Sequence, residues 1–256
     1  MQIKILGAHN TESKDTKHVT LLIDEVLAVE AGALASSLSF AEQQRIKAIL
    51  LTHHHYDHIR DIPAVAMNAF LHEARIHVYS TQTVYDALAN YLLNGELYPR
   101  FLTRPEDNPT IQFTVLAPGS TVKIAGYTVM AVPMTHSIPA VGFQVTSPRG
   151  KTVFYTGDTG ADLTECWRSI MPQLLIIEVT MSNRWEEYAR MSGHLTPGML
   201  KQELEHFREL NGYLPQVIAV HMVPGQEEEI AAELAVVSAD LGHTIALARE
   251  GMQVRL

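Results

Sequence analysis

Short apolar segments alternate with polar turns in the first part of the chain, a pattern that is typical of β-strands. The polar pair Asp24-Glu25 lies between two apolar segments and predicts a hairpin turn. The apolar segment Ala48–Leu51 predicts a strand that ends at Thr52, directly before a cluster of histidines. The predicted strands of this part are Ile3–Leu6, Val19–Ile23, Val26–Val29, Ala48–Leu51 and Arg75–Val78, and its predicted helices are Ala41–Arg45, Ala64–Phe70 and Val84–Leu93.

The second part of the chain follows a predicted loop over Tyr98–Pro109, which is rich in proline, asparagine and aspartate. Its strands come first and its helices later. The helix that begins at Pro197 has Thr196 as its N-cap, and both residue types are favourable at a helix start. The predicted strands are Ile111–Leu116, Tyr127–Val132, Phe143–Thr146, Thr152–Tyr155, Leu174–Ile177, Val217–Val220 and Thr244–Leu247, and the predicted helices are Leu163–Ile170, Pro197–Leu210 and Glu227–Ser238.

Two halves with strands first and helices later predict two sheets packed face to face with helices outside, which is an α/β sandwich. A hydrophobic content of 46% is enough for a sizeable buried core. We therefore interpret residues 1–256 as a single domain built from two halves. No apolar run reaches the roughly 18 residues that a membrane span needs, so we expect a soluble, cytoplasmic protein without membrane contact.

Two features of the composition restrict the chemistry. Cys166 is the only cysteine, which excludes an intrachain disulfide and a cysteine-based zinc site. Any metal must therefore be held by histidine and carboxylate. The formal net charge of -9 argues against a surface that binds long nucleic acid, and it favours a small substrate.

The strongest motif is the segment Thr52–His58, in which His53, His55, Asp57 and His58 supply four metal donors. Alternate side chains of an extended segment point to one side, so two histidines can bind one ion while the next two donors turn toward a second. A single histidine here would more often be a packed residue bonded to the backbone. Four donors directly after an apolar strand favour a metal site.

Further donors stand where later predicted strands end, and they complete two sets. One ion would take His53, His55 and His136, and the other would take Asp57, His58 and His221. Asp158 would bridge the two ions through its two carboxylate oxygens. Nitrogen and oxygen donors without thiolate suit Zn²⁺ first, with Mn²⁺ or Fe²⁺ as substitutes.

This order of donors, from the cluster to His136, Asp158 and His221, resembles the metallo-β-lactamase superfamily. The resemblance implies a four-layer αββα sandwich with the metals at one edge. Members of the superfamily hydrolyse β-lactams, thioesters, lactones and phosphodiesters, so the ligand set alone does not select a reaction.

Further segments look like class II cyclic-nucleotide phosphodiesterases, over about residues 28 to 235, and Gly193–Pro197 is the most distinctive of them. The chain departs from that family at Tyr56, where leucine is usual, and at Arg60-Asp61, where a small residue and glycine are common. These departures concern substrate preference more than activity. The similar segments are Val29–Leu34, Ile49–Thr52 with its cluster, Thr156–Gly160, Ile177–Thr180 and Ser192–Pro197.

The resemblance implies hydrolysis of a 3′,5′-cyclic nucleotide such as cAMP to the 5′-nucleotide, with a hydroxide between two metal ions as the nucleophile. Such a reaction also needs a proton for the departing alkoxide. His194 is the candidate donor, and Glu178 would orient its ring and keep it protonated. Asp57, Glu178 and His194 are therefore the predicted catalytic residues.

Several alternatives remain open. Ribonuclease Z carries a similar glutamate and histidine, but it recognises tRNA through a long arm between the third metal histidine and the bridging aspartate. Here that interval is 158 − 136 = 22 residues, which is enough only for a strand, a turn and a strand. A lactonase or thioesterase remains possible, and a non-catalytic nucleotide binder is disfavoured because all seven ligands are present. A homodimer is also possible.

Overall fold

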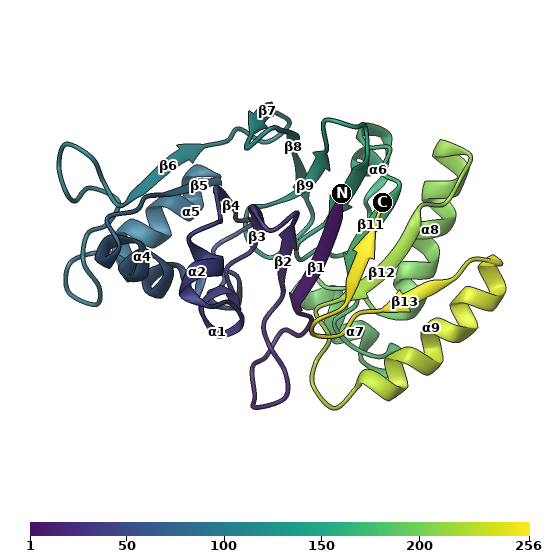
Figure 1. The fold of residues 1–256 in the computed structure, drawn as a ribbon. Coiled ribbons are helices and arrows are strands. Elements are labelled where there is room, and N and C mark those ends of the chain that lie inside the picture. The colour runs from purple at the N-terminus through teal and green to yellow at the C-terminus, as the bar shows by residue number, and fades with distance from the viewer.

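A computed structural model describes all 256 residues of the chain. Two seven-stranded sheets pack face to face, and helices cover their outer surfaces (Figure 1). The predicted four-layer αββα sandwich is confirmed. None of the helices combines the length and the apolar composition that a membrane crossing requires.

The first sheet has the strand order β14-β1-β2-β3-β4-β5-β6. Its strands are antiparallel from β14 to β3 and parallel from β3 to β6. The β2–β3 hairpin turns at Asp24-Glu25 as predicted, and both residues have positive φ angles, of 46° and 61°. The strands are β1 (Gln2–Gly7), β2 (Thr20–Ile23), β3 (Leu27–Val29), β4 (Ala48–Leu50), β5 (Ile76–Ser80), β6 (Ile111–Val115) and β14 (Gln253–Arg255).

The second sheet repeats this arrangement in the order β13-β12-β11-β10-β9-β8-β7. Its strands are antiparallel from β7 to β10 and parallel from β10 to β13. The strands are β7 (Thr121–Ile124), β8 (Tyr127–Met134), β9 (Ala140–Thr146), β10 (Thr152–Tyr155), β11 (Leu174–Glu178), β12 (Gln216–Val220) and β13 (Ile245–Leu247).

Helices of the first half cover one outer face and those of the second half cover the other (Figure 1). The predicted start of α8 is confirmed, because the Thr196 side chain accepts a hydrogen bond from the backbone N–H of Met199. The predicted helix over Val84–Leu93 is split into α5 and a π-helical turn η1. The helices are α1 (Leu34–Ser37), α2 (Phe40–Gln43), α3 (Tyr56–Ile59), α4 (Ile62–Leu71), α5 (Gln82–Ala87), η1 (Leu88–Leu92), α6 (Thr164–Ser169), η2 (Asn183–Trp185), α7 (Glu186–Ser192), α8 (Pro197–Asn211) and α9 (Glu227–Leu241).

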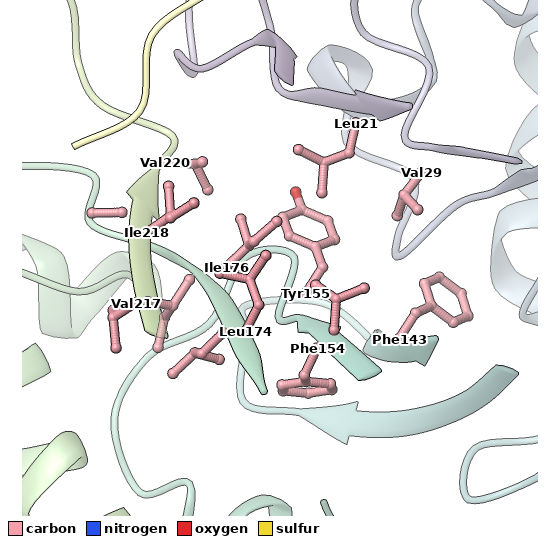
Figure 2. Close-up of a cluster of buried hydrophobic side chains, with 14 of the residues drawn as sticks. Leu21, Val29, Phe143, Phe154, Tyr155, Leu174, Ile176, Val217, Ile218 and Val220 are labelled. Carbon is pink, nitrogen blue, oxygen red and sulfur yellow. The ribbon is translucent and has the colours of Figure 1, made fainter. Parts of the chain in front are cut away.

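The alternation of side chains along β2 and β3 divides the core into two layers. Leu21 and Val29 face the second sheet and join a cluster of 50 buried residues. Their neighbours Leu22 and Ala28 point the other way, into a cluster of 22 residues beneath the helices of the first half. Figure 2 shows Leu21 and Val29 opposite Tyr155 and other side chains of the second sheet. Two-sided burial explains why β3 and the segment Leu21–Ile23 of β2 are apolar at every position.

Candidate metal centre

The first-half donors lie where β4 ends. His53 lies three residues after the end of this strand, and His55 is the N-cap of α3. Asp57 and His58 lie in the first turn of this short helix, which the sequence pattern did not predict. The turn of the helix brings both side chains round to the same edge of the sandwich as the two histidines before it.

The second-half donors lie at the ends of three strands of the other sheet. His136 follows β8, Asp158 follows β10 and His221 follows β12. His221 has a φ angle of 69°, a left-handed conformation that costs a non-glycine residue roughly 1–3 kcal/mol. Its backbone N–H donates to the carbonyl oxygen of Ala8 at 2.6 Å, which holds it there. Strain of this kind is concentrated at functional sites.

The seven side chains form two groups that share one residue. His53, His55, His136 and Asp158 make the first group, and Asp57, His58, Asp158 and His221 make the second, with donor atoms within 4.8 Å of one another in each. The structure thus brings together the two sets that the sequence suggested. Their role as metal ligands remains a prediction.

Asp158 turns one carboxylate oxygen toward each group. Its Oδ2 lies 3.7 Å from His53 Nε2 and 3.9 Å from His136 Nε2. Its Oδ1 lies 3.3 Å from His58 Nε2 and 3.2 Å from His221 Nε2. A carboxylate placed in this way can serve two ions at once.

The short contacts between donor atoms within each group fit a bound cation better than they fit hydrogen bonds between the side chains. His55 Nδ1 faces ring nitrogens of His53 and His136 at 3.1 and 3.2 Å, where at most one of each pair can carry the shared proton. Both ring nitrogens of His58 and the Oδ1 of Asp158 are buried without a hydrogen-bond partner. Buried polar atoms without partners are costly, and a metal ion would satisfy His58 Nε2 and Asp158 Oδ1. The donor set therefore fits a divalent metal.

The outer nitrogens of the histidines are bonded in a way that fixes the tautomer. The Thr52 hydroxyl donates to the buried Glu30 and accepts from His53 Nδ1 at 2.9 Å. The Thr180 hydroxyl likewise donates to Glu178 at 2.5 Å and accepts from His221 Nδ1 at 2.8 Å. Both histidines then present a bare Nε2 to the centre, the form that a metal needs.

Two further contacts hold the outer ring nitrogens of other histidines. His136 Nδ1 donates to the backbone carbonyl of Gly193 at 2.9 Å. His58 Nδ1 lies 3.1 Å from Glu30 Oε1, so Glu30 serves both His58 and, through Thr52, His53. Sequence reasoning did not assign Glu30 or the two threonines. The available signal was a glutamate at the end of a fully apolar strand.

The charges of the site also favour cations. Burial, reinforced by the neighbouring His58, lowers the pKa of His53 well below its usual range and keeps the ring neutral. Burial alone would lower the pKa of His58, but the carboxylates of Asp158, Asp57 and Glu30 raise it well above its usual range. Three carboxylates around one position create a demand for positive charge, which a divalent ion would meet.

Glu178 and His194 lie beside the second group. His194 Nδ1 donates to Glu178 Oε1 at 2.7 Å, so the pairing expected from the sequence is present. Burial lowers the pKa of His194, but the adjacent Glu178 carboxylate outweighs this and raises it to about 9. The imidazole stacks on His221 with ring centroids 5.5 Å apart, and its side chain remains 16% exposed. His194 is therefore a protonated group that a substrate can reach.

His54 belongs to neither of the two groups.

Removal of the Thr180 hydroxyl should weaken metal binding without removing a ligand. We expect Thr180→Val to raise the metal dissociation constant by about 10- to 100-fold, because His221 would lose the partner that fixes its ring. Competition with a chelating dye would measure the constant. Thr110→Val is the matched control, since Thr110 is equally buried but bonds only to the Arg104 carbonyl. Equal metal affinity in the two variants would refute the orienting role of Thr180.

Residues 20–222 match a family model described as a β-lactamase superfamily domain. Among curated proteins, ribonuclease Z of Methanopyrus kandleri is 24% identical over 144 residues, which are 54% of this chain and 47% of that protein. The chain thus aligns with less than half the length of this relative.

Solved structures share the fold over the whole chain. Unliganded yeast PDE1 superposes with a TM-score of 0.84 at 17% identity, covering 100% of this chain and 99% of that one. The short form of human tRNase Z superposes with a TM-score of 0.70 at 18% identity, with 100% and 99% coverage. Identities at this level show the fold and leave the reaction open.

Proposed function

The chain belongs to the metallo-β-lactamase superfamily. We propose that it is a ribonuclease Z-like member that hydrolyses 3′,5′-cyclic nucleotides to 5′-nucleotides. The family and the cluster of histidines and aspartates indicate a metal-dependent hydrolase. The choice of a phosphodiester, and of a small cyclic one, rests on the residues around that cluster.

The cofactor that we propose is a pair of divalent ions, Zn²⁺ first and Mn²⁺ or Fe²⁺ as substitutes. The first group of donors would hold one ion, the second group the other, and Asp158 both. When bound, such ions supply an activated water and neutralise charge on the phosphoryl oxygens. Asp57 contributes a carboxylate that stays ionised, because His58 and His221 outweigh its burial and hold its pKa well below the usual range.

The observation that carries the proposal is the position of His194. Its Nδ1 is held by Glu178, which leaves Nε2 as the proton donor. As the oxygen of water bonds to phosphorus and the bond from phosphorus to the 3′ oxygen breaks, the Nε2 proton would pass to that oxygen. The 3′ oxygen would become a hydroxyl of the product, whose sugar stays attached to phosphorus through the 5′ oxygen. An alkoxide is a poor leaving group, so a positioned acid matters most for this class of substrate. Opening of a thioester makes less demand on such a donor, because a thiolate is a better leaving group than an alkoxide.

The short segment between His136 and Asp158 favours a small substrate. This interval contains β9, a turn and β10, with no room for a tRNA-docking arm. The net charge of -9 supports the same choice. A ribonuclease Z-like activity is the second candidate, because the curated relatives carry that name.

Direct assay distinguishes these candidates. Protein loaded with Zn²⁺ or Mn²⁺ should convert cyclic AMP or cyclic GMP to the 5′-monophosphate, while precursor tRNA, a 2′,3′-cyclic nucleotide and a thioester react poorly. Chromatography of the products would identify the bond that is cleaved. Position-specific cleavage of precursor tRNA at a higher kcat/KM would replace the proposed function with the second candidate.

A further inference from the structure

A neutral cleft lies at the same edge of the sandwich as the candidate metal centre. Its volume is about 480 Å³, which is within the range of small-molecule sites. The ends of β5, β6 and β8 and the start of β9 form it. It is lined by Thr81, Gln82, Thr83, Val115, Leu116, Ala117, Pro118, Pro133, Met134, Pro139, Ala140 and Val141.

Two short stretches of the chain link the lining of the cleft to metal donors. Met134 and Pro139 line it and flank the segment that carries His136. The backbone N–H of Val141, which also lines the cleft, donates to the carbonyl oxygen of Thr52 at 3.1 Å, directly before His53. A ligand whose phosphate lies among the metal donors could therefore extend into the cleft.

The lining suits a flat, uncharged group. No charged side chain lines the cleft, so a phosphate would gain nothing there. Val115 is 47% exposed, an uncovered apolar surface at the end of β6 that a planar ring would cover. The cavity between α2 and α4 holds only about 30 Å³, too little for a base, and it lies in the outer helical layer.

We propose that this cleft binds the base of the cyclic nucleotide and that Gln82 selects adenine. This inference rests on the proposed function and adds the substrate's base to it. One N–H of the Gln82 amide donates to Asp86 Oδ1 at 2.8 Å, which fixes the amide and leaves one N–H and the carbonyl oxygen free. One donor beside one acceptor matches adenine N7 and its 6-amino group. Guanine presents two acceptors at that edge and needs two donors.

Two substitutions test the subsite. Gln82→Ala should lower the ratio of kcat/KM for cyclic AMP to that for cyclic GMP by about tenfold, within the range that a bidentate base contact provides. Val115→Trp should fill the cleft. We expect it to lower the ratio of kcat/KM for cyclic AMP to that for methyl p-nitrophenyl phosphate, which has no base, by about tenfold or more. The dissociation constant of adenosine 5′-monophosphate, measured by calorimetry, should rise in both variants.

Thr114→Trp is the matched control, because Thr114 is exposed on the same strand but does not line the cleft. Its substrate ratios should equal those of the wild type, and thermal unfolding would establish that all three variants fold. Wild-type ratios in Gln82→Ala and Val115→Trp, with cyclic nucleotides still cleaved, would overturn the base subsite alone. Failure of the wild type to cleave any cyclic nucleotide would overturn the proposed function and the subsite with it.

Discussion

Asp158→Ala should abolish both metal binding and phosphodiesterase activity. Each group of donors would lose one ligand, and the site would lose the buried negative charge that offsets repulsion between two cations. Loss of a single electrostatic donor usually lowers the rate by about 10²- to 10³-fold. We expect kcat/KM for cyclic AMP to fall by more than this. Elemental analysis of the purified variant, together with the assay, would measure both effects.

The control for this prediction is Asp107→Ala, which removes an exposed carboxylate in the loop before β6. It should retain the metal content and activity of the wild type. Asp158→Asn adds a finer comparison, because it keeps the shape and removes the charge. Two ions per chain in Asp158→Ala would show that the bridging role is wrong.

His194→Ala should fail in a different way, with metal content unchanged and turnover reduced by about 10²- to 10⁴-fold, the usual contribution of a positioned acid. The loss should depend on the leaving group. The leaving group of cyclic AMP is the 3′ alkoxide, which needs the proton, whereas that of bis(p-nitrophenyl) phosphate is a phenolate that is stable near neutral pH. The first substrate should therefore be affected strongly and the second only slightly.

Glu178→Gln should show the same dependence more mildly, because Glu178 holds His194 and does not meet the substrate. His206→Ala, at an exposed position of α8, is the matched control and should behave as wild type. Equal losses on both phosphodiesters, with both ions retained, would mean that His194 positions the phosphate and transfers no proton.

Most of the helices and strands could be predicted because each has a local pattern of apolar and polar residues. Fully apolar segments such as Leu174–Ile177 indicate buried parallel strands, and the capped start at Thr196 indicates a long helix. The short helices α3 and α7 were missed, since four and seven residues are too few for a helical period to appear. The strand β14 was missed because its three residues pair with β1 at the other end of the chain.

In the candidate site, too, some residues could be predicted from the sequence and others could not. The donors could be predicted because the cluster at His53–His58 is dense and the later donors follow apolar strands. Glu30, Thr52 and Thr180 were not assigned, because their function depends on which ring nitrogen they contact in three dimensions. Residue type alone does not distinguish such a partner from an ordinary buried hydroxyl.

The pairing of β1 with β14 also has a consequence for how the chain folds. Ile3 lies opposite Val254, so the first sheet acquires its edge strand only when Gln253–Arg255 have been synthesised. During synthesis on the ribosome, one edge of β1 therefore stays unpaired while the rest of both halves is being made. Pairings across such a separation in sequence carry a high entropic cost and slow folding. An unpaired edge is a site of aggregation, so the chain is prone to aggregate during this interval.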